Sequence, residues 1–118
     1  MTWVRTGVAV ATLPESRPQE LVVGARTLVL VRSSDRLQAL DGICPHLGGL
    51  LAEGTVEGDR LACPLHGAVF SVSSGAVVAD PFGLEPPEGG VDPLRTFPTR
   101  VEAGMVEVDL PDEAPPTA

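Results

Sequence analysis

The sequence contains no lysine, asparagine or tyrosine, and only one tryptophan and three phenylalanines in 118 residues. With so few aromatic side chains, the core must be built mainly from Val, Leu and Ala, and Val-rich segments favour β-strands. Eight arginines stand against sixteen acidic residues, so the net charge is −8. Such an acidic chain repels phosphate groups, which argues against nucleic acid as a partner.

Long hydrophobic runs are also missing. No apolar run approaches the roughly 20 residues of a membrane-spanning helix. A signal peptide begins with a charged region followed by an apolar stretch. The N-terminal sequence, residues 1–5, lacks this pattern, so we expect no signal peptide. We therefore expect no membrane association and a cytoplasmic location. The chain length predicts a single domain over residues 1–118.

Turn-forming residues are plentiful, with 13 glycines and 12 prolines. Such frequent glycine and proline residues are typical of short strands joined by many turns. We predict a hinge at Gly24-Ala25 and a hairpin around Ala103-Gly104. The candidate strands lie within 6–13, 20–34, 36–43, 56–62, 70–78 and 100–110. About nine or ten short strands of this kind predict an all-β antiparallel sandwich or barrel.

Two segments stand apart from this pattern. Residues 80–93 form a Pro/Gly-rich segment longer than most loops of compact domains. Its Phe82 and Leu84 either shield a site or contact a partner, or else they belong to an inserted loop that packs on the sandwich. Residues 111–118 are polar and Pro-rich, and we expect this tail to fray.

All four soft metal ligands of the chain lie in one short segment. The first pair, Cys44 and His46, is separated by one residue. The second pair, Cys63 and His66, is separated by two residues, and sixteen residues lie between the pairs. Thiolate and imidazole together suit zinc or iron. Two close pairs on two turns can converge on one metal centre.

Other interpretations of these four residues remain open at this point. The cysteines could form one disulfide, or could be small buried hydrophobes. A Cys–His nucleophile would need only one pair and leaves the second pair unexplained. Structural zinc sites favour closely spaced cysteines together and closely spaced histidines together. Here each cysteine is paired with a histidine, which is atypical of zinc.

The order Cys-x-His, sixteen residues, Cys-x-x-His-Gly resembles the signature of the Rieske [2Fe–2S] family. The stretch HGAVFSVSSGAVV at 66–78 and the final hairpin segment at 93–110 also resemble that family. The resemblance therefore spans about residues 22–110. It implies a Rieske-like β-sandwich whose cluster-binding subdomain, about residues 42–82, consists of two loops.

The same resemblance implies the ligands of one [2Fe–2S] cluster. Cys44 and Cys63 hold one iron, and His46 and His66 hold the other. Two thiolates and two neutral imidazoles leave the oxidised cluster formally neutral, so it accepts an electron more readily than a cluster with four thiolates. The implied activity is one-electron transfer, so the chain is not expected to be an enzyme by itself.

The resemblance also places seven residues around the cluster: Leu47, Gly49, Leu65, Gly67, Ala68, Phe70 and Pro81. The two leucines are expected to shield the cluster from water. The small residues allow backbone amides to approach sulfide. Pro81 corresponds to a proline-containing loop of the family.

The chain departs from the high-potential members of the family. Those members carry a disulfide where this chain has Gly49 and Leu65, and hydroxyl donors where it has Ala68 and Phe70. Donors to the cluster and ligand sulfurs stabilise the reduced, more negative cluster, so their absence lowers the potential. The sequence therefore predicts a low-potential centre.

A small, acidic, low-potential Rieske domain is similar to the ferredoxins of bacterial aromatic-ring-hydroxylating dioxygenase systems. The implied partners are a flavin-dependent ferredoxin reductase and a terminal oxygenase. Two alternatives are a small Rieske subunit of an assimilatory nitrite reductase complex and a zinc-binding structural module. A red-brown protein that bleaches on reduction distinguishes the iron centre from colourless zinc.

We expect protein-film voltammetry to give a potential near the bottom of the Rieske range, about −150 mV. The physical reason is the absence of hydroxyl donors at positions 68 and 70. A value above about +100 mV would contradict this interpretation.

Overall fold

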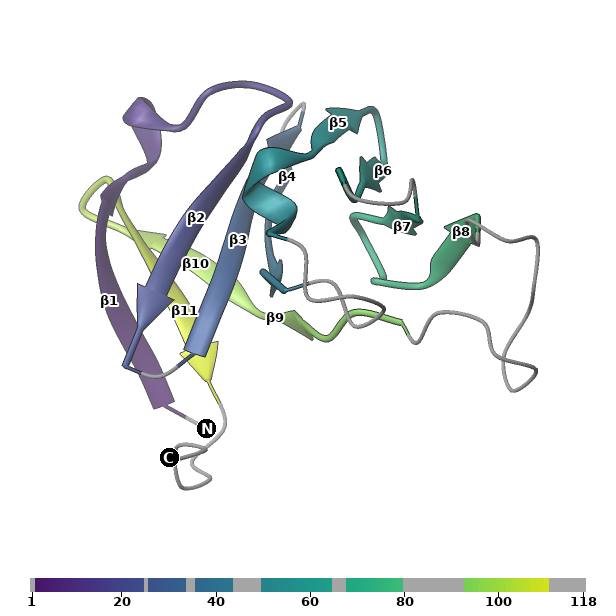
Figure 1. The fold of residues 1–118 in the computed structure, drawn as a ribbon. Helices are drawn as coiled ribbons and strands as arrows, with labels where there is room; N and C mark the ends of the chain where they lie inside the picture. The colour runs from purple at the N-terminus through teal and green to yellow at the C-terminus, as the bar shows by residue number, and fades with distance from the viewer. Residues whose placement is uncertain are drawn as a thin grey trace.

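Eleven β-strands form three antiparallel sheets in the computed structural model, which describes residues 2–24, 26–33, 36–43, 50–64, 68–79 and 93–110. The helical elements in those ranges are two 3-10 turns, η1 (Val10–Thr12) and η2 (Leu51–Glu53). No helix in the described ranges is long and apolar enough to cross a membrane. The predicted all-β antiparallel architecture is confirmed (Figure 1).

The terminal sheet joins β1 (Thr2–Ala9), β11 (Met105–Leu110) and β10 (Thr99–Glu102) in that order. The turn between β10 and β11 contains Ala103 and Gly104, with positive φ angles of 51° and 81°. Two successive positive φ angles are typical of the tight turns that match the twist of a hairpin. The predicted hairpin is therefore confirmed.

The predicted first strand, 6–13, is wrong at both ends. The observed β1 starts at Thr2 and stops at Ala9, after which η1 turns the chain. The Thr12 hydroxyl donates to the Ala9 carbonyl at 2.7 Å, and the Leu13 N–H donates to the Val10 carbonyl at 3.2 Å. These local hydrogen bonds end the strand, although the residues themselves favour one.

The middle sheet contains β2 (Pro18–Val23), β3 (Arg26–Ser33), β4 (Arg36–Asp41) and β9 (Thr96–Phe97). The chain turns after β2 at Gly24, whose φ of +60° suits glycine. This agrees with the predicted hinge. The short β9 pairs with the end of β4 and so brings a distant part of the sequence to the edge of this sheet.

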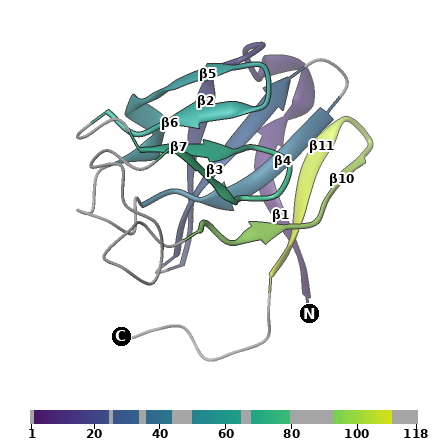
Figure 2. The same ribbon diagram turned by 90° about the vertical axis from the view of Figure 1, so that its right-hand side faces the viewer.

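The small sheet contains β5 (Thr55–Glu57), β6 (Arg60–Ala62), β7 (Val69–Ser71) and β8 (Val77–Ala79), in sequence order. The sequence predicted strands within 56–62 and 70–78, which this sheet contains. It did not separate this sheet from the middle one, because strands of three residues carry too little periodicity. The sheet is visible beside β3 and β4 in Figures 1 and 2.

The middle sheet lies between the terminal sheet and the small sheet, so β3 is buried on both faces (Figures 1 and 2). Successive side chains of a strand point to opposite faces. Leu28 and Leu30 therefore contact one core, while Val29 and Val31 contact the other. This double burial explains the unbroken apolar run in β3. All four side chains are fully buried.

Two predicted segments fall largely or wholly outside the described residues. The structure describes the Pro/Gly-rich segment only from Pro93, and it does not describe the tail at 111–118. The extent of a single domain over 1–118 stays a prediction.

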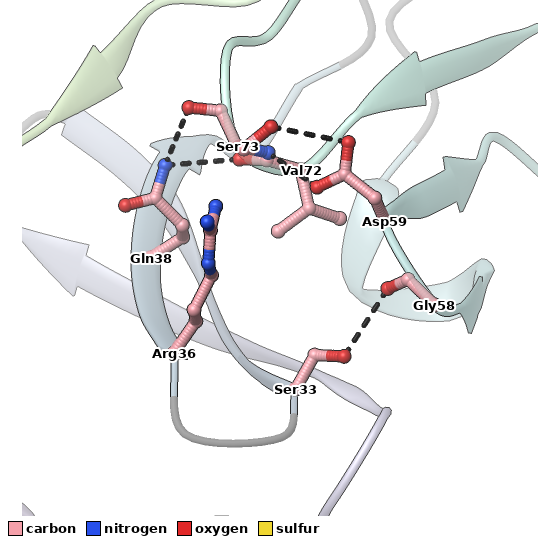
Figure 3. A pocket seen from close by; sticks show the side chains of 7 residues that line it. All are labelled: Ser33, Arg36, Gln38, Gly58, Asp59, Val72 and Ser73. Carbon is pink, nitrogen blue, oxygen red and sulfur yellow. Dashed lines mark hydrogen bonds between the residues drawn. The ribbon is translucent and has the colours of Figure 1, made fainter.

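Side chains of the middle sheet hydrogen-bond to the turns of the small sheet (Figure 3). The Gln38 Nε2 group donates to the carbonyls of Val72 and Ser73, both at 3.0 Å. The Ser33 hydroxyl donates to the Gly58 carbonyl at 3.2 Å. These bonds fix both turns at this end of the small sheet to the β3–β4 hairpin.

Asp59 joins the two turns to one another (Figure 3). Its Oδ2 accepts hydrogen bonds from the Ser71 hydroxyl at 2.6 Å and the Ser73 hydroxyl at 3.1 Å, and its Oδ1 accepts the Ser73 N–H at 2.9 Å. The Ser71 bond is the main cause that lowers the pKa of Asp59, against the opposing effect of burial. The bonds from Ser73 and the charge of Arg36 lower that pKa further.

We expect Asp59→Ala to lower the free energy of unfolding by about 1 kcal/mol at neutral pH, because three hydrogen bonds to an exposed carboxylate are lost. The folded-state pKa lies below the unfolded one, so this stabilisation is complete above about pH 4 to 5. It is lost as the pH falls through the folded pKa. Thermal unfolding from neutral to acid pH measures the difference between variant and wild type.

The exposed Glu53 supplies the control variant, Glu53→Ala. The stability difference caused by Asp59→Ala should shrink on acidification, while that caused by Glu53→Ala stays small throughout. A difference for Asp59→Ala that grows as the pH falls would contradict the assignment.

Candidate metal centre

Cys63 directly follows β6 and is the one sequence-predicted ligand within the described residues. It is only 5% exposed, and its thiol is free. The residue belongs to the same buried cluster as Leu51 and Phe70. An unpaired thiol held in an apolar core is compatible with a metal ligand that must be kept from water. The other predicted ligands, Cys44, His46 and His66, lie outside the described residues.

A backbone hydrogen bond closes the second ligand turn. The Cys63 N–H donates to the Ala68 carbonyl at 2.8 Å. This bond follows the β6–β7 ladder, in which Ala62 is opposite Val69. The described chain stops just after Cys63 and resumes at Ala68, and these two residues are joined by this hydrogen bond. The cysteine of the second motif sits on a fixed strand end.

The first ligand segment, residues 44–49, is flanked by Gly42–Ile43 and Leu50–Leu51. We call these flanking residues its root. Ile43 and Leu50 form an antiparallel bridge, and the Leu51 N–H donates to the Gly42 carbonyl at 3.0 Å. A Cβ atom added to Gly42 would lie only 2.8 Å from the carbonyl of Leu28. Only glycine fits so close to β3 without a shift of the backbone. The described residues on either side of the first ligand segment are therefore paired with one another.

The roots of the two ligand segments lie against one another. Leu51 follows the first segment, Cys63 precedes the second, and both belong to one buried cluster. Gly54, at the end of η2, lies so close to the Ala62 carbonyl oxygen that no Cβ atom can be accommodated. The chain returning from the first segment is thus pressed against the strand that leads to Cys63. This contact was not predicted, because nothing in the local sequence marks Gly54 as different from other turn glycines.

Two of the predicted supporting residues are described. Ala68 is 1% exposed, and the Phe70 side chain is fully buried opposite Leu61. Neither side chain can donate a hydrogen bond, and this absence of donors is the basis of the predicted low potential. The remaining predicted supporting residues lie outside the described residues: Leu47, Gly49, Leu65, Gly67 and Pro81.

The residues present fit a [2Fe–2S] group. Cys63 supplies a buried, unpaired thiol, and the two ligand segments start from neighbouring roots. Two thiolates and two imidazoles are the donor set of Rieske centres. Within the ranges that the structure describes, no group of three or more His, Cys, Asp or Glu residues is placed to hold a metal ion.

Comparison with known proteins agrees with this site. The chain is 30% identical over 102 residues to the anthranilate 1,2-dioxygenase ferredoxin subunit of Burkholderia cepacia, covering 86% of this chain and 87% of the relative. A ferredoxin of Sphingomonas yanoikuyae B1 superimposes with a TM-score of 0.78 at 25% identity, covering 93% of this chain and all of that chain. A solved complex of reduced oxygenase and oxidized ferredoxin in carbazole 1,9a-dioxygenase matches with a TM-score of 0.73 at 30% identity, over 90% of this chain and 91% of the other.

A further solved structure is less similar in sequence and shares the fold alone. The small subunit of a putative NADH-dependent nitrite reductase from Mycobacterium tuberculosis has a TM-score of 0.73 at 19% identity, covering 91% of this chain and 93% of that one. The family model of the Rieske [2Fe-2S] domain matches residues 3–98. With that match and the dioxygenase ferredoxins as relatives, the chain belongs to the Rieske [2Fe–2S] domain family.

Proposed function

We propose that the chain is a one-electron carrier between a flavin-dependent ferredoxin reductase and a terminal oxygenase of the ring-hydroxylating type. Relatives that match this chain over most of their own length include ferredoxin components of dioxygenase systems, which are electron carriers and not catalytic enzymes. The observation that carries the proposal is the buried, free thiol of Cys63 at a closed turn. We place the protein in the cytoplasm, where thiols stay reduced.

We assign one iron of the cluster to Cys44 and Cys63 and the other to His46 and His66. The bound cluster supplies a site for one electron, and no proton or substrate need be handled. We assign the cluster-binding part of the chain to about residues 42–82. The thiol of Cys63 supports this assignment, because it is buried in one core at a strand end that a backbone hydrogen bond fixes.

The described residues around Cys63 exclude water from its side of the site. Leu51, Leu61 and Phe70 are fully buried in one core with it. The apolar wall lowers the local dielectric and fixes the strand end at Cys63, so electron transfer needs little rearrangement of this part of the protein. Exposed apolar side chains lie at the first root: Ile43 is 40% and Leu50 is 37% exposed. They offer a partner an apolar contact beside the ligand segments.

Charge supports the choice of partners. A carrier with a net charge of −8 is attracted to basic surfaces, which speeds encounter at low salt. A relative of this chain is known in complex with an oxygenase. We therefore infer a basic docking surface on the oxygenase, and another on the reductase.

Stopped-flow spectroscopy tests the function with the reductase and oxygenase encoded beside this gene. The reductase should reduce the chain, the oxygenase should reoxidise it, and both rates should fall as salt screens the charges. A series with an uncharged solute at matched viscosity is the control, because it changes viscosity without screening charge. A gene neighbourhood with a sirohaem reductase and no oxygenase, or a chain that the oxygenase cannot reoxidise, would contradict the proposal.

We expect Ala68→Ser and Phe70→Tyr to raise the reduction potential within the Rieske range of about −150 to +300 mV. Each adds a hydroxyl donor at a buried position next to the Cys63 turn, and such donors stabilise the reduced cluster. Phe97→Tyr is the matched control, because Phe97 is buried in the other core. Voltammetry that shows equal shifts in Phe70→Tyr and Phe97→Tyr would rule out a local effect.

A further inference from the structure

The root of the first ligand segment is tied to a part of the chain that is distant in sequence. Asp41 is the last residue of β4 and lies three positions before Cys44. Its N–H donates to the Arg95 carbonyl at 3.0 Å, and its Oδ2 accepts the Arg95 N–H at 3.0 Å. These bonds extend the β4–β9 pairing, in which Ala39 is opposite Phe97.

The second of these bonds is unusual for the end of a ladder. The acceptor for the Arg95 N–H is a carboxylate oxygen of Asp41, where a regular strand pair would use a main-chain carbonyl. A hydrogen bond to a charged acceptor is stronger than one between neutral groups. Directly after Asp41 the chain leaves the strand through Gly42 toward the first ligand segment. The side chain therefore secures the point at which that segment departs.

The neighbouring residue ties the same stretch to the small sheet. The Leu94 N–H donates to the Gly75 carbonyl at 2.8 Å, and the Leu94 side chain is 4% exposed in the core that contains Cys63. Gly75 has φ of +78°, and an added Cβ atom would collide with the Leu94 carbonyl oxygen. Leu94 and Arg95 thus connect the β7–β8 turn to the end of β4.

We infer that Asp41 is a positioning residue for the cluster, holding the root of the Cys44 segment in register with the sheet that carries Cys63. This inference rests on the proposed function. Removal of the carboxylate frees the Arg95 N–H and loosens the link from the small sheet through Leu94 to Asp41. The first ligand segment then keeps its ligands but loses part of its fixed root.

The test compares Asp41→Ala with Asp41→Asn in the full-length protein loaded with its cluster. Asparagine keeps an oxygen that can accept the Arg95 N–H, whereas alanine does not. We expect alanine to speed cluster loss to a chelator by about tenfold or more and to change the electron paramagnetic resonance (EPR) line shape of the reduced cluster. Asparagine keeps the bond but loses the charge of the acceptor, so in both measurements it should lie between alanine and wild type. Asp41→Glu keeps the charge but displaces the carboxylate oxygen, so it should also speed cluster loss. It replaces the alanine variant in the test if that variant does not fold.

Thr6→Ala is the matched control for a general loss of stability. The Thr6 hydroxyl oxygen also accepts a backbone N–H, that of Val8 at 3.1 Å, but in the terminal sheet. This variant should lower thermal stability and leave the EPR line shape and the rate of cluster loss unchanged. The inference is overturned if Asp41→Ala and Thr6→Ala behave alike in both measurements, or if Asp41→Asn loses its cluster as fast as Asp41→Ala. A wild-type protein that binds no iron–sulfur cluster overturns the proposed function itself, before any variant is compared.

Discussion

The burial of one apolar face of the middle sheet against the small sheet is the interaction on which the rest of the structure depends. Val29 and Val31 of β3 contact the same core as Leu61 and Phe70 of β6 and β7. Strands of three residues cannot hold a sheet together by their hydrogen bonds alone. Their contact with a longer, doubly buried strand gives them a fixed position. Cys63 follows directly from one of these short strands, so its position depends on that contact.

Hydrogen bonds add orientation to this burial. Gln38 and Ser33 bind carbonyls in the turns of the small sheet, and Asp59 joins those turns together. Leu94 binds the Gly75 carbonyl of the β7–β8 turn, and the next residue, Arg95, binds Asp41 at the end of β4. Apolar burial is non-directional, whereas hydrogen bonds fix angles. The small sheet is therefore held in a defined orientation on the middle sheet.

Local features could be predicted from the sequence, whereas contacts between residues far apart in the chain could not. The hinge at Gly24 and the hairpin at Gly104 follow from backbone conformations that few residues adopt, so both were predictable. The family followed from ligand type and spacing, which are local. The early end of β1 was missed, because the hydroxyl of Thr12 competes with the strand. The pairing of Asp41 with Arg95 was missed as well, since it joins residues 54 positions apart and no local pattern reports it.

The central claim is that two thiolates and two imidazoles hold one cluster at the roots described above. Pulsed EPR of the reduced protein tests it most directly, because it detects nitrogen nuclei bound to the cluster. We predict hyperfine couplings from two histidine nitrogens, one of which disappears in His46→Cys and the other in His66→Cys. A reduced cluster without nitrogen couplings, or a colourless protein that contains zinc, would contradict the account.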